Sequence, residues 1–392
     1  MIDDKIFSID EYDFKFEGIK GILKRSASDF KVNEIDFNNN MIDFQRVTKD
    51  DTLEKTGMFL WIDIWRKNID HGKMIFLLSD YFGVNEKDVT TAGIKDAKAE
   101  IIQLVAIFNP QKNIKKGELL EGKLKIRNLR YERDGLFPGH MKGNYFQIII
   151  NNCTKLNKET IEKFKKFCKS GILNYYGYQR FGSYRPITSL LGRELILKNY
   201  ENAVNIFLGG ESINEDELFR KNWRDFKSPK KLLEAWDRVP YLEKKLLLHL
   251  VDKKDDFEGA IKKLPSYLIN LAKSSFISQL FNEYISYRGR EKKILKGERQ
   301  VDENIEIALP SHHWKEPLNE IWRKVFDKFS INVNKDLVDV RHSSRLLYIY
   351  PKLFHYEVLS DNQLLIEFSL KNGQYATIVL RELMKSDVSC YF

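Results

Sequence analysis

The sequence has few of the residues that build disulfide frameworks or metal centres. It contains only three cysteines among 392 residues, and no two of them form a CxxC pair: Cys153, Cys168 and Cys390. An odd and dispersed set of cysteines fits a reducing compartment. Adjacent histidines occur once, at His312 and His313, with no cysteine nearby to complete a zinc site. We therefore expect no metal.

Membrane and nucleotide-binding signals are also missing. The longest apolar runs, such as Ile101 to Phe108, are far too short to cross a bilayer, and Met1 to Lys5 does not resemble a signal peptide. Gly177 to Gly182 has the glycine spacing of a phosphate-binding loop, but Ser183 follows where that loop needs lysine. We expect a cytoplasmic protein that needs no cofactor. The chain also has no heptads, and we expect a monomer.

Positive charge is in modest excess. The formal net charge is +9, with 65 basic and 56 acidic residues, and the pI is about 9.0. This balance favours a polyanionic partner such as nucleic acid. The charges largely interleave, however, and a chain rich in lysine and glutamate is also typical of heat-adapted organisms. Charge alone leaves both interpretations open.

The hydrophobic pattern predicts an α+β protein with a helical middle. Expected strands lie at 19–23, 30–37, 58–65, 89–92, 100–108, 144–151, 305–309, 346–350, 353–359 and 364–370, and expected helices at 69–82, 161–169, 188–197, 200–208, 229–239, 241–251, 264–287, 317–329 and 375–384. The residues from Pro186 to Tyr287 are mostly helical in pattern. The simplest organisation is an α+β core interrupted by a helical insertion.

One loop between two expected strands concentrates reactive groups. Gly93 to Ala99 joins the strands and carries the carboxylate of Asp96 between Lys95 and Lys98. Neighbouring cations favour an ionised carboxylate, which can act as a nucleophile or a base. Gly93 suits a sharp turn or a close backbone approach. A solvated, charged turn is the alternative that these residues alone favour.

A basic segment follows from Lys123 to Arg133. Five cations alternate with apolar residues there: Lys123, Lys125, Arg127, Arg130 and Arg133. The segment is either an edge strand with a solvated face or a strip that contacts phosphates.

Five separated segments together resemble the TruD family of pseudouridine synthases. They are Gly21–Lys24 with Ser28–Glu34, Ala92–Asp96 with Ala99 and Gln103, Lys142–Phe146, Asn174–Gly182 with Arg185–Thr188, and Asn372–Glu382. Their order spans nearly the whole chain. Two positions depart from the family pattern: Ile101 stands where threonine is usual, and the glycine–arginine signature is only loosely present at 341–345.

The resemblance implies a pseudouridine-synthase-like core with a mixed, largely antiparallel sheet, formed by residues 1–170 and 335–392. A mostly helical TRUD insertion domain would occupy residues 171–334, which agrees with the change of pattern near Gly171. The implied activity is conversion of a uridine in RNA, by family resemblance uridine 13 of tRNA, to pseudouridine. The partner is then tRNA.

The resemblance also implies the site residues. Asp96 matches the family's catalytic aspartate, and Lys24 matches a basic position that pairs with it, a role that Lys95 could share. Phe146 matches an aromatic that stacks on the target base, and Asn144 matches a polar contact beside it. Arg180 and Arg185 are expected to bind RNA, with the nearby aromatics Tyr176, Tyr178 and Phe181 lining a cleft.

Two other functions compete with the enzyme. A non-catalytic RNA-binding module or RNA chaperone would use the same groove without chemistry, but it has no need of a lysine–aspartate pair. A globular protein with incidental charge would show no salt-sensitive affinity for RNA. Each implied site residue also has an ordinary structural explanation, such as a surface lysine for Lys24 or a core aromatic for Phe146.

Overall fold

The computed structural model describes residues 4–10, 12–45, 53–137, 139–182, 185–210, 217–236, 238–291, 293–311, 314, 318–337, 340 and 342–392. The chain divides into two compact units. The first consists of Phe14–Ile172 and Ile349–Phe392, and the second of Ile2–Asp13 and Leu173–Tyr348. The sequence-based boundaries lie at 170/171 and 334/335.

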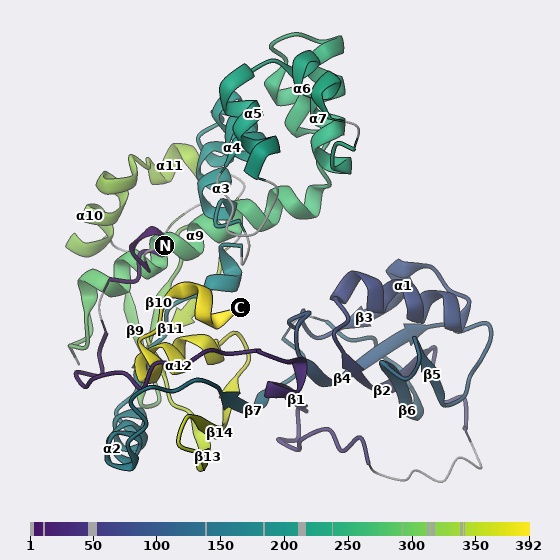
Figure 1. Cartoon of the computed structure of the whole chain (residues 1–392), viewed down its shortest axis with the longest axis vertical. Coiled ribbons are helices and arrows are strands. Elements are labelled where there is room, and N and C mark those ends of the chain that lie inside the picture. The colour runs from purple at the N-terminus through teal and green to yellow at the C-terminus, as the bar shows by residue number, and fades with distance from the viewer. Residues whose placement is uncertain are drawn as a thin grey trace. The chain divides into compact units, whose positions relative to one another are not determined.

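The first unit is built on a sheet to which nine strands contribute in the described chain. They are β1 (Phe30–Ile35), β2 (Phe59–Lys67), β3 (Val89–Thr91), β4 (Glu100–Phe108), β5 (Gly117–Leu119), β6 (Leu124–Glu132), β7 (Gly143–Ile150), β13 (Lys352–Ser360) and β14 (Gln363–Lys371). The strand order is β13-β14-β7-β1-β4-β2-β6-β5, with β3 paired to β4 (Figure 1). Only the β1–β4 pair is parallel among these strands.

Helix α1 (His71–Phe82) covers one face of the β2–β4–β6 part of the sheet (Figure 1). Its Met74, Leu78 and Phe82 pack in one core with inward residues of the strands, such as Ile62 and Val105. The helix begins at the N-cap Asp70, whose side chain accepts from Lys73 N, and ends at Gly83, which has a left-handed backbone. Periodic apolar residues between these two caps are what allowed the sequence to predict this helix.

The opposite face of the same strands carries a second core. Trp61, Leu104 and Ala106 point to this side because successive strand residues alternate between faces. Ala92 and Leu136, from the segments that follow β3 and β6, pack against them. This core therefore fixes the start of the loop that carries Asp96.

The predicted strand at 19–23 is wrong. The structure has there only an isolated bridge between Ile22 and Asn151. Lys20, Gly21 and Lys24 have positive φ angles of 57°, 112° and 54°, so the backbone cannot extend. At Gly21 a Cβ would lie 2.6 Å from the Ile150 side chain. The turn allows Lys24 to point toward the sheet.

Two further helices complete the first unit. Helix α2 (Lys158–Lys169) places Phe164 against Phe354 of β13 and against Phe14. All nine residues of α12 (Ala376–Met384) are buried. The end of α12 binds the segment before Lys24, because Leu383 O and Met384 O accept from Ile19 N and Lys20 N.

The second unit contains most of the helices. They are α3 (Thr188–Ile196), α4 (Tyr200–Gly209), α5 (Glu217–Phe226), α6 (Pro229–Ala235), α7 (Tyr241–Asp252), α8 (Phe257–Ile261), α9 (Ser266–Arg288), α10 (Glu320–Phe329) and α11 (Val333–Asp336). The predicted stripe of Phe276, Leu280 and Tyr284 on α9 is fully buried. Helices α5 and α8 were not predicted from the sequence. The predicted start of α10 at Pro317 lies outside the described residues.

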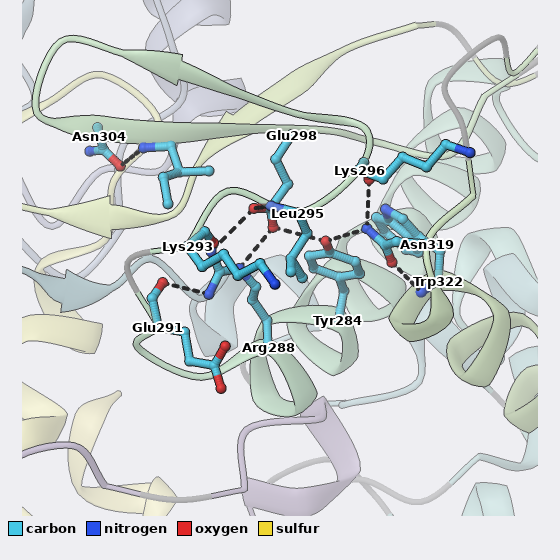
Figure 2. A network of polar contacts seen from close by, with 11 residues as sticks. Tyr284, Arg288, Glu291, Lys293, Leu295, Lys296, Glu298, Asn304, Asn319 and Trp322 are labelled. Carbon is cyan, nitrogen blue, oxygen red and sulfur yellow. Dashed lines mark hydrogen bonds and ion pairs between the residues drawn. The ribbon is translucent and has the colours of Figure 1, made fainter.

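The second unit also holds a small antiparallel sheet of β9 (Glu298–Val301), β10 (Asn304–Ala308) and β11 (Ser344–Leu346). The predicted strand at 346–350 is divided between β11 and the two-residue β12 (Tyr348–Ile349), and β8 (Ile172–Leu173) is equally short. Figure 2 shows the buried ion pair that joins Glu298 of β9 to Arg288 at the end of α9.

Candidate active site

The loop with Asp96 starts where β3 ends and finishes where β4 begins. Val89–Thr91 pairs with Val105–Ile107, so the loop connects two antiparallel neighbours in the sheet. Gly93 does not need glycine for its backbone, since its φ is not positive and a Cβ would come only within 3.6 Å of Lys95 Nζ. The backbone does bend at Ala92 and Gly93, but a Cβ at Gly93 would make only an ordinary contact with Lys95, so no close backbone approach requires glycine there.

Asp96 forms a short ion pair with Lys24. Lys24 Nζ lies 2.7 Å from Asp96 Oδ2, and the lysine side chain is 4% exposed while the aspartate side chain is 31% exposed. The lysine also lies over the Phe30 ring, with Nζ 4.5 Å from the ring centroid. The ring packs against the lysine on one side. A buried cation thus faces a carboxylate that remains open to solvent.

Lys95 pairs with a different carboxylate. Its Nζ lies 2.6 Å from Glu34 Oε1, and the Glu34 side chain is fully buried. The second oxygen of Glu34 accepts from Leu104 N at 2.9 Å. The β1–β4 register ends at Asn33 and Ile102, so Glu34 satisfies a backbone donor of β4 beyond the end of the pairing. Through Glu34, Lys95 fixes the loop to β1.

Arg66 of β2 contacts the main chain of the same loop. It is fully buried, and its guanidinium donates to Asp96 O at 3.5 Å, to Lys95 O at 3.4 Å and to Ile69 O. Its Nε donates to Gln103 Oε1 at 3.2 Å. The planar fork of arginine can reach several carbonyls at once, which lysine cannot. Arg66 therefore fixes the main chain of the loop, and Lys24 fixes the Asp96 side chain.

Burial, together with the charges around the loop, shifts the pKa of two basic groups. Burial lowers the pKa of Arg66 to about 10, although Asp96, Asp70 and Glu34 act in the opposite direction. Arg66 consequently stays protonated at neutral pH. Burial also lowers the pKa of His71, and the positive charges of Arg66 and Lys95 lower it further. His71, the first residue of α1, is therefore neutral at pH 7.

The two residues expected to contact the base lie on β7. Asn144 and Phe146 point to the face that also carries Glu34 and Val32, their register partners on β1. Phe146 is 7% exposed and packs between Phe30, at 6.1 Å, and Phe368, at 5.7 Å. The buried Oδ1 atom of Asn144 accepts no hydrogen bond from the described residues. Phe30 therefore links Phe146 to Lys24.

Arg180 and Arg185 belong to the second unit, and both contact neighbouring residues of that unit. Arg180 Nε donates to Ser278 Oγ of α9 at 3.0 Å. Arg185 Nη2 donates to Phe207 O at 2.6 Å, and its Nη1 lies 3.7 Å from Glu243. Their expected contact with RNA stays a prediction.

The aromatic residues near these arginines differ in exposure. Tyr178 and Phe181 are fully buried and pack against Phe7. Tyr176 is half-buried, with the Arg345 guanidinium 3.8 Å from its ring centroid. Of these aromatics, Tyr176 alone keeps surface for a ligand.

The basic segment at 123–133 forms β6, which pairs with β2 and, over its first residues, with β5. Several of its cations have local partners. Lys125 pairs with Glu118, Arg130 pairs with Asp63, and Arg127 lies over the Phe44 ring. These contacts are what we expect of a strand with a solvated face. Phosphate binding by this segment stays a prediction.

Three functional candidates came only from the structure: Glu34, Arg66 and Phe30. Phe30 and Glu34 belong to the first of the five motifs, but the sequence alone assigned no role to either residue. Arg66 had one usable signal, a charged residue two positions after Ile64 on the strand face that also carries Leu60 and Ile62. Together these residues orient one solvent-accessible carboxylate, which is suited to nucleophilic attack or proton abstraction.

Within the described ranges no group of three or more His, Cys, Asp or Glu side chains is arranged to bind a metal. His312 and His313 lie outside those ranges. The helices that are described include none with the length and apolarity needed to span a membrane.

Comparisons with known proteins agree over most of the chain. The family model described as tRNA pseudouridine synthase D (TruD) matches residues 7–316. A Pyrobaculum aerophilum protein named "Probable tRNA pseudouridine synthase D" is 25% identical, over 93% of this chain and 92% of the relative. A Nanoarchaeum equitans protein of the same name is 28% identical, over 81% and 85% respectively.

A solved structure supports the fold. The crystal structure of a TruD protein from Methanosarcina mazei covers 98% of both chains with a TM-score of 0.73 at 22% sequence identity. The α+β fold class inferred from sequence is confirmed, and so is the resemblance drawn from the five motifs. The chain belongs to the TruD family of tRNA pseudouridine synthases, which are isomerases.

Proposed function

We propose that this chain converts uridine 13 of tRNA to pseudouridine with Asp96 as the catalytic carboxylate and without a cofactor. The observation that carries the proposal is the Lys24–Asp96 pair, in which a buried ammonium fixes a carboxylate that solvent can reach. Oδ2 faces Lys24, and no described residue donates a hydrogen bond to Oδ1. Oδ1 is therefore the atom assigned to the reaction.

The reaction is an isomerisation, so no atoms are gained or lost overall. The bond between C1′ and N1 breaks, the uracil turns, and C5 bonds to C1′. C5 then loses its hydrogen to solvent while N1 takes up a proton. Asp96 either attacks C1′ to form an ester that is later displaced, or removes a proton from C2′ and returns it. Lys24 holds the Asp96 side chain in place for both routes through the 2.7 Å ion pair.

The target base would bind beside Asn144 and Phe146. A uridine within folded RNA must leave its stack to reach a carboxylate on a protein, and aromatic contacts then replace the lost stacking. Asn144 is half-buried as a whole, and its amide carries both a donor and an acceptor group that suit the polar edge of uracil. Phe146 presents only a small exposed edge, so its main role is to support Phe30 beneath Lys24.

Catalysis and binding of the tRNA body would belong to different parts of the chain. Residues 1–170 and 335–392 form the proposed catalytic core, which contains Lys24, Asp96, Asn144 and Phe146. These four residues lie in the first compact unit, whereas residues 2–13 and 335–348 of the proposed core belong to the second. Residues 171–334 form the insertion domain and would bind the body of the tRNA through Arg180 and Arg185. The enzyme acts as a cytoplasmic monomer.

Tritium release tests the chemistry directly. Unmodified tRNA transcripts labelled at uridine C5 lose tritium only when C5 bonds to carbon. We expect release by the wild type, no release by Asp96→Asn, and release unchanged by a chelator. A transcript with cytidine at position 13 should lose none of its tritium, and release from it would shift the target to another uridine.

The same variant distinguishes the enzyme from a binding module. Asp96→Asn replaces one carboxylate oxygen by an amide NH2 group of similar size. RNA affinity should therefore stay within about twofold of the wild type, while product formation stops. If the wild type binds tRNA with strong salt dependence but releases no tritium from tRNA or total RNA, the non-catalytic RNA-binding alternative is correct instead.

A further inference from the structure

An exposed aromatic surface lies in the first unit, formed by Phe37, Phe137 and His140. Phe137 is 56% exposed and stacks on the His140 ring, with centroids 5.0 Å apart and planes 9° from parallel. Phe37 is 49% exposed, and its ring centroid lies 6.2 Å from that of His140. Trp61 supports His140 from below in an edge contact of 5.9 Å. Grouped exposed rings of this kind mark interaction sites more often than single exposed residues do.

The aromatic surface is attached to the start of the Asp96 loop. Leu136 N donates to Thr90 Oγ1 at 3.3 Å, and Gly139 N donates to Ala92 O at 3.2 Å. Asp96 is four residues beyond Ala92, which limits the separation of these two Cα atoms to about 14 Å. Phe137 therefore lies within reach of the nucleotides that flank a uridine bound at Asp96.

The other two rings adjoin the strand ends that carry site residues. Phe37 follows Glu34 by three residues, and Ile42 N donates to Glu34 O to close that turn. His140 precedes Asn144 by four residues, and Lys142 N donates to Ile35 O. The aromatic surface thus joins the ends of β1, β3 and β7, where Glu34, Asp96 and Asn144 also lie.

We propose that the aromatic surface binds unpaired bases of the substrate RNA by stacking, next to the nucleotide that is modified. Flat rings suit flat bases, and stacking of this kind tolerates any base sequence. A stable protein partner would instead bury about 800 Å² on each side, more than three partly exposed rings supply. The location beside the reacting uridine rests on the proposed function of Asp96.

Binding measurements in an Asp96→Asn background test the proposal without turnover. The double variant Phe37→Ala, Phe137→Ala should bind an unmodified tRNA transcript about tenfold more weakly or worse. The slope of log affinity against log salt should not change, because no phosphate contact is removed. Phe137→Trp keeps a stacking ring and should bind like the parent. Phe76→Ala removes a ring of similar exposure, 58%, from α1 and should have no effect.

Fluorescence supplies a second measurement. A 2-aminopurine base placed beside position 13 should be quenched on binding to the parent and should recover fluorescence in the double variant. Thermal melting checks the fold, and Phe137→Leu replaces Phe137→Ala if the double variant is unstable. Affinity within twofold of the parent, or a changed oligomeric mass in the double variant, would overturn the proposal. Tritium release by the enzyme with Asp96 intact is measured separately and tests only the catalytic role of Asp96.

Discussion

Lys24 and Asp96 are separated by 71 residues in sequence, yet Lys24 Nζ lies 2.7 Å from Asp96 Oδ2. The pair is asymmetric, because the lysine is enclosed by the fold and the aspartate faces solvent. The turn at Lys20 to Lys24, with its positive φ angles, places the lysine there. Arg66 binds the main chain of the same aspartate, so side chain and backbone are fixed independently.

Removal of the Lys24 charge should impair catalysis more than binding. In Lys24→Met the carboxylate loses its ion-pair partner, and we expect kcat for tritium release to fall about a hundredfold, as for loss of one fixed donor at a reacting oxygen. The Kd for tRNA should stay within about threefold. Lys31→Met, at an exposed position of β1, is the matched control and should leave kcat unchanged. Equal losses in both variants would indicate a general charge effect.

Arg66 is a positioning residue, and its substitution should separate kcat from KM. Arg66→Lys keeps a positive charge but cannot reach the carbonyls of Lys95 and Asp96 together. A displacement of the loop by about 1 Å can cost up to a hundredfold in rate, so we expect kcat to fall at least tenfold with KM unchanged. A merely structural role would instead reduce the amount of folded enzyme and leave kcat per active site intact, which a tight-binding RNA titration measures.

His71 should make the folded state less stable in mild acid. Its pKa is lowered in the folded protein from the ordinary value of 6.5, chiefly by burial and then by Arg66 and Lys95, while Asp70 acts in the opposite direction. The unfolded chain therefore takes up this proton more readily as the pH falls through 6.5, and the free energy of unfolding decreases. Urea denaturation at pH 7.5 and pH 5.5 should show a smaller decrease for His71→Asn than for the wild type. An identical decrease would show that His71 is not the group responsible.

The network in Figure 2 predicts a strong dependence of the second unit on Arg288. Arg288 Nε lies 2.8 Å from Glu298 Oε1, and both side chains are almost fully buried. Arg288→Met leaves a buried carboxylate without its cation, which should cost about 3–5 kcal/mol. The double variant Arg288→Met, Glu298→Leu should recover part of that loss. Denaturation followed by tryptophan fluorescence is suitable, because Trp322 stacks on Tyr284 within the network.

An exposed ion pair gives the control for this prediction. Lys262 and Glu258 lie one helical turn apart on the surface of the same unit. Lys262→Met should leave the free energy of unfolding almost unchanged, because both side chains are exposed and water screens the pair. If Arg288→Met had an equally small effect, burial of the Arg288–Glu298 pair would contribute nothing to stability.

The sequence predicted the elements that carry local signals. Helix α1 has a capping aspartate, periodic apolar residues and a terminal glycine, and β4 is a long apolar run, so both were found near their observed bounds. The strand predicted at 19–23 is wrong because its apolar residues suggested an extended chain, whereas Lys20 and Gly21 have positive φ angles and Gly21 lies against Ile150, a residue far away in sequence. Short elements such as α8 have too few residues to show a period.

By itself the sequence determined the family, the α+β class and the candidate residues Lys24, Lys95 and Asp96, because spaced motifs and hydrophobic periodicity are properties of the chain. Which lysine pairs with Asp96 was decided only by the tertiary structure. Lys95 is adjacent in sequence but binds Glu34, while Lys24 reaches Asp96 from a distant turn. Ion pairs depend on distance in space and on burial, and the sheet register that sets both joins residues far apart in the chain.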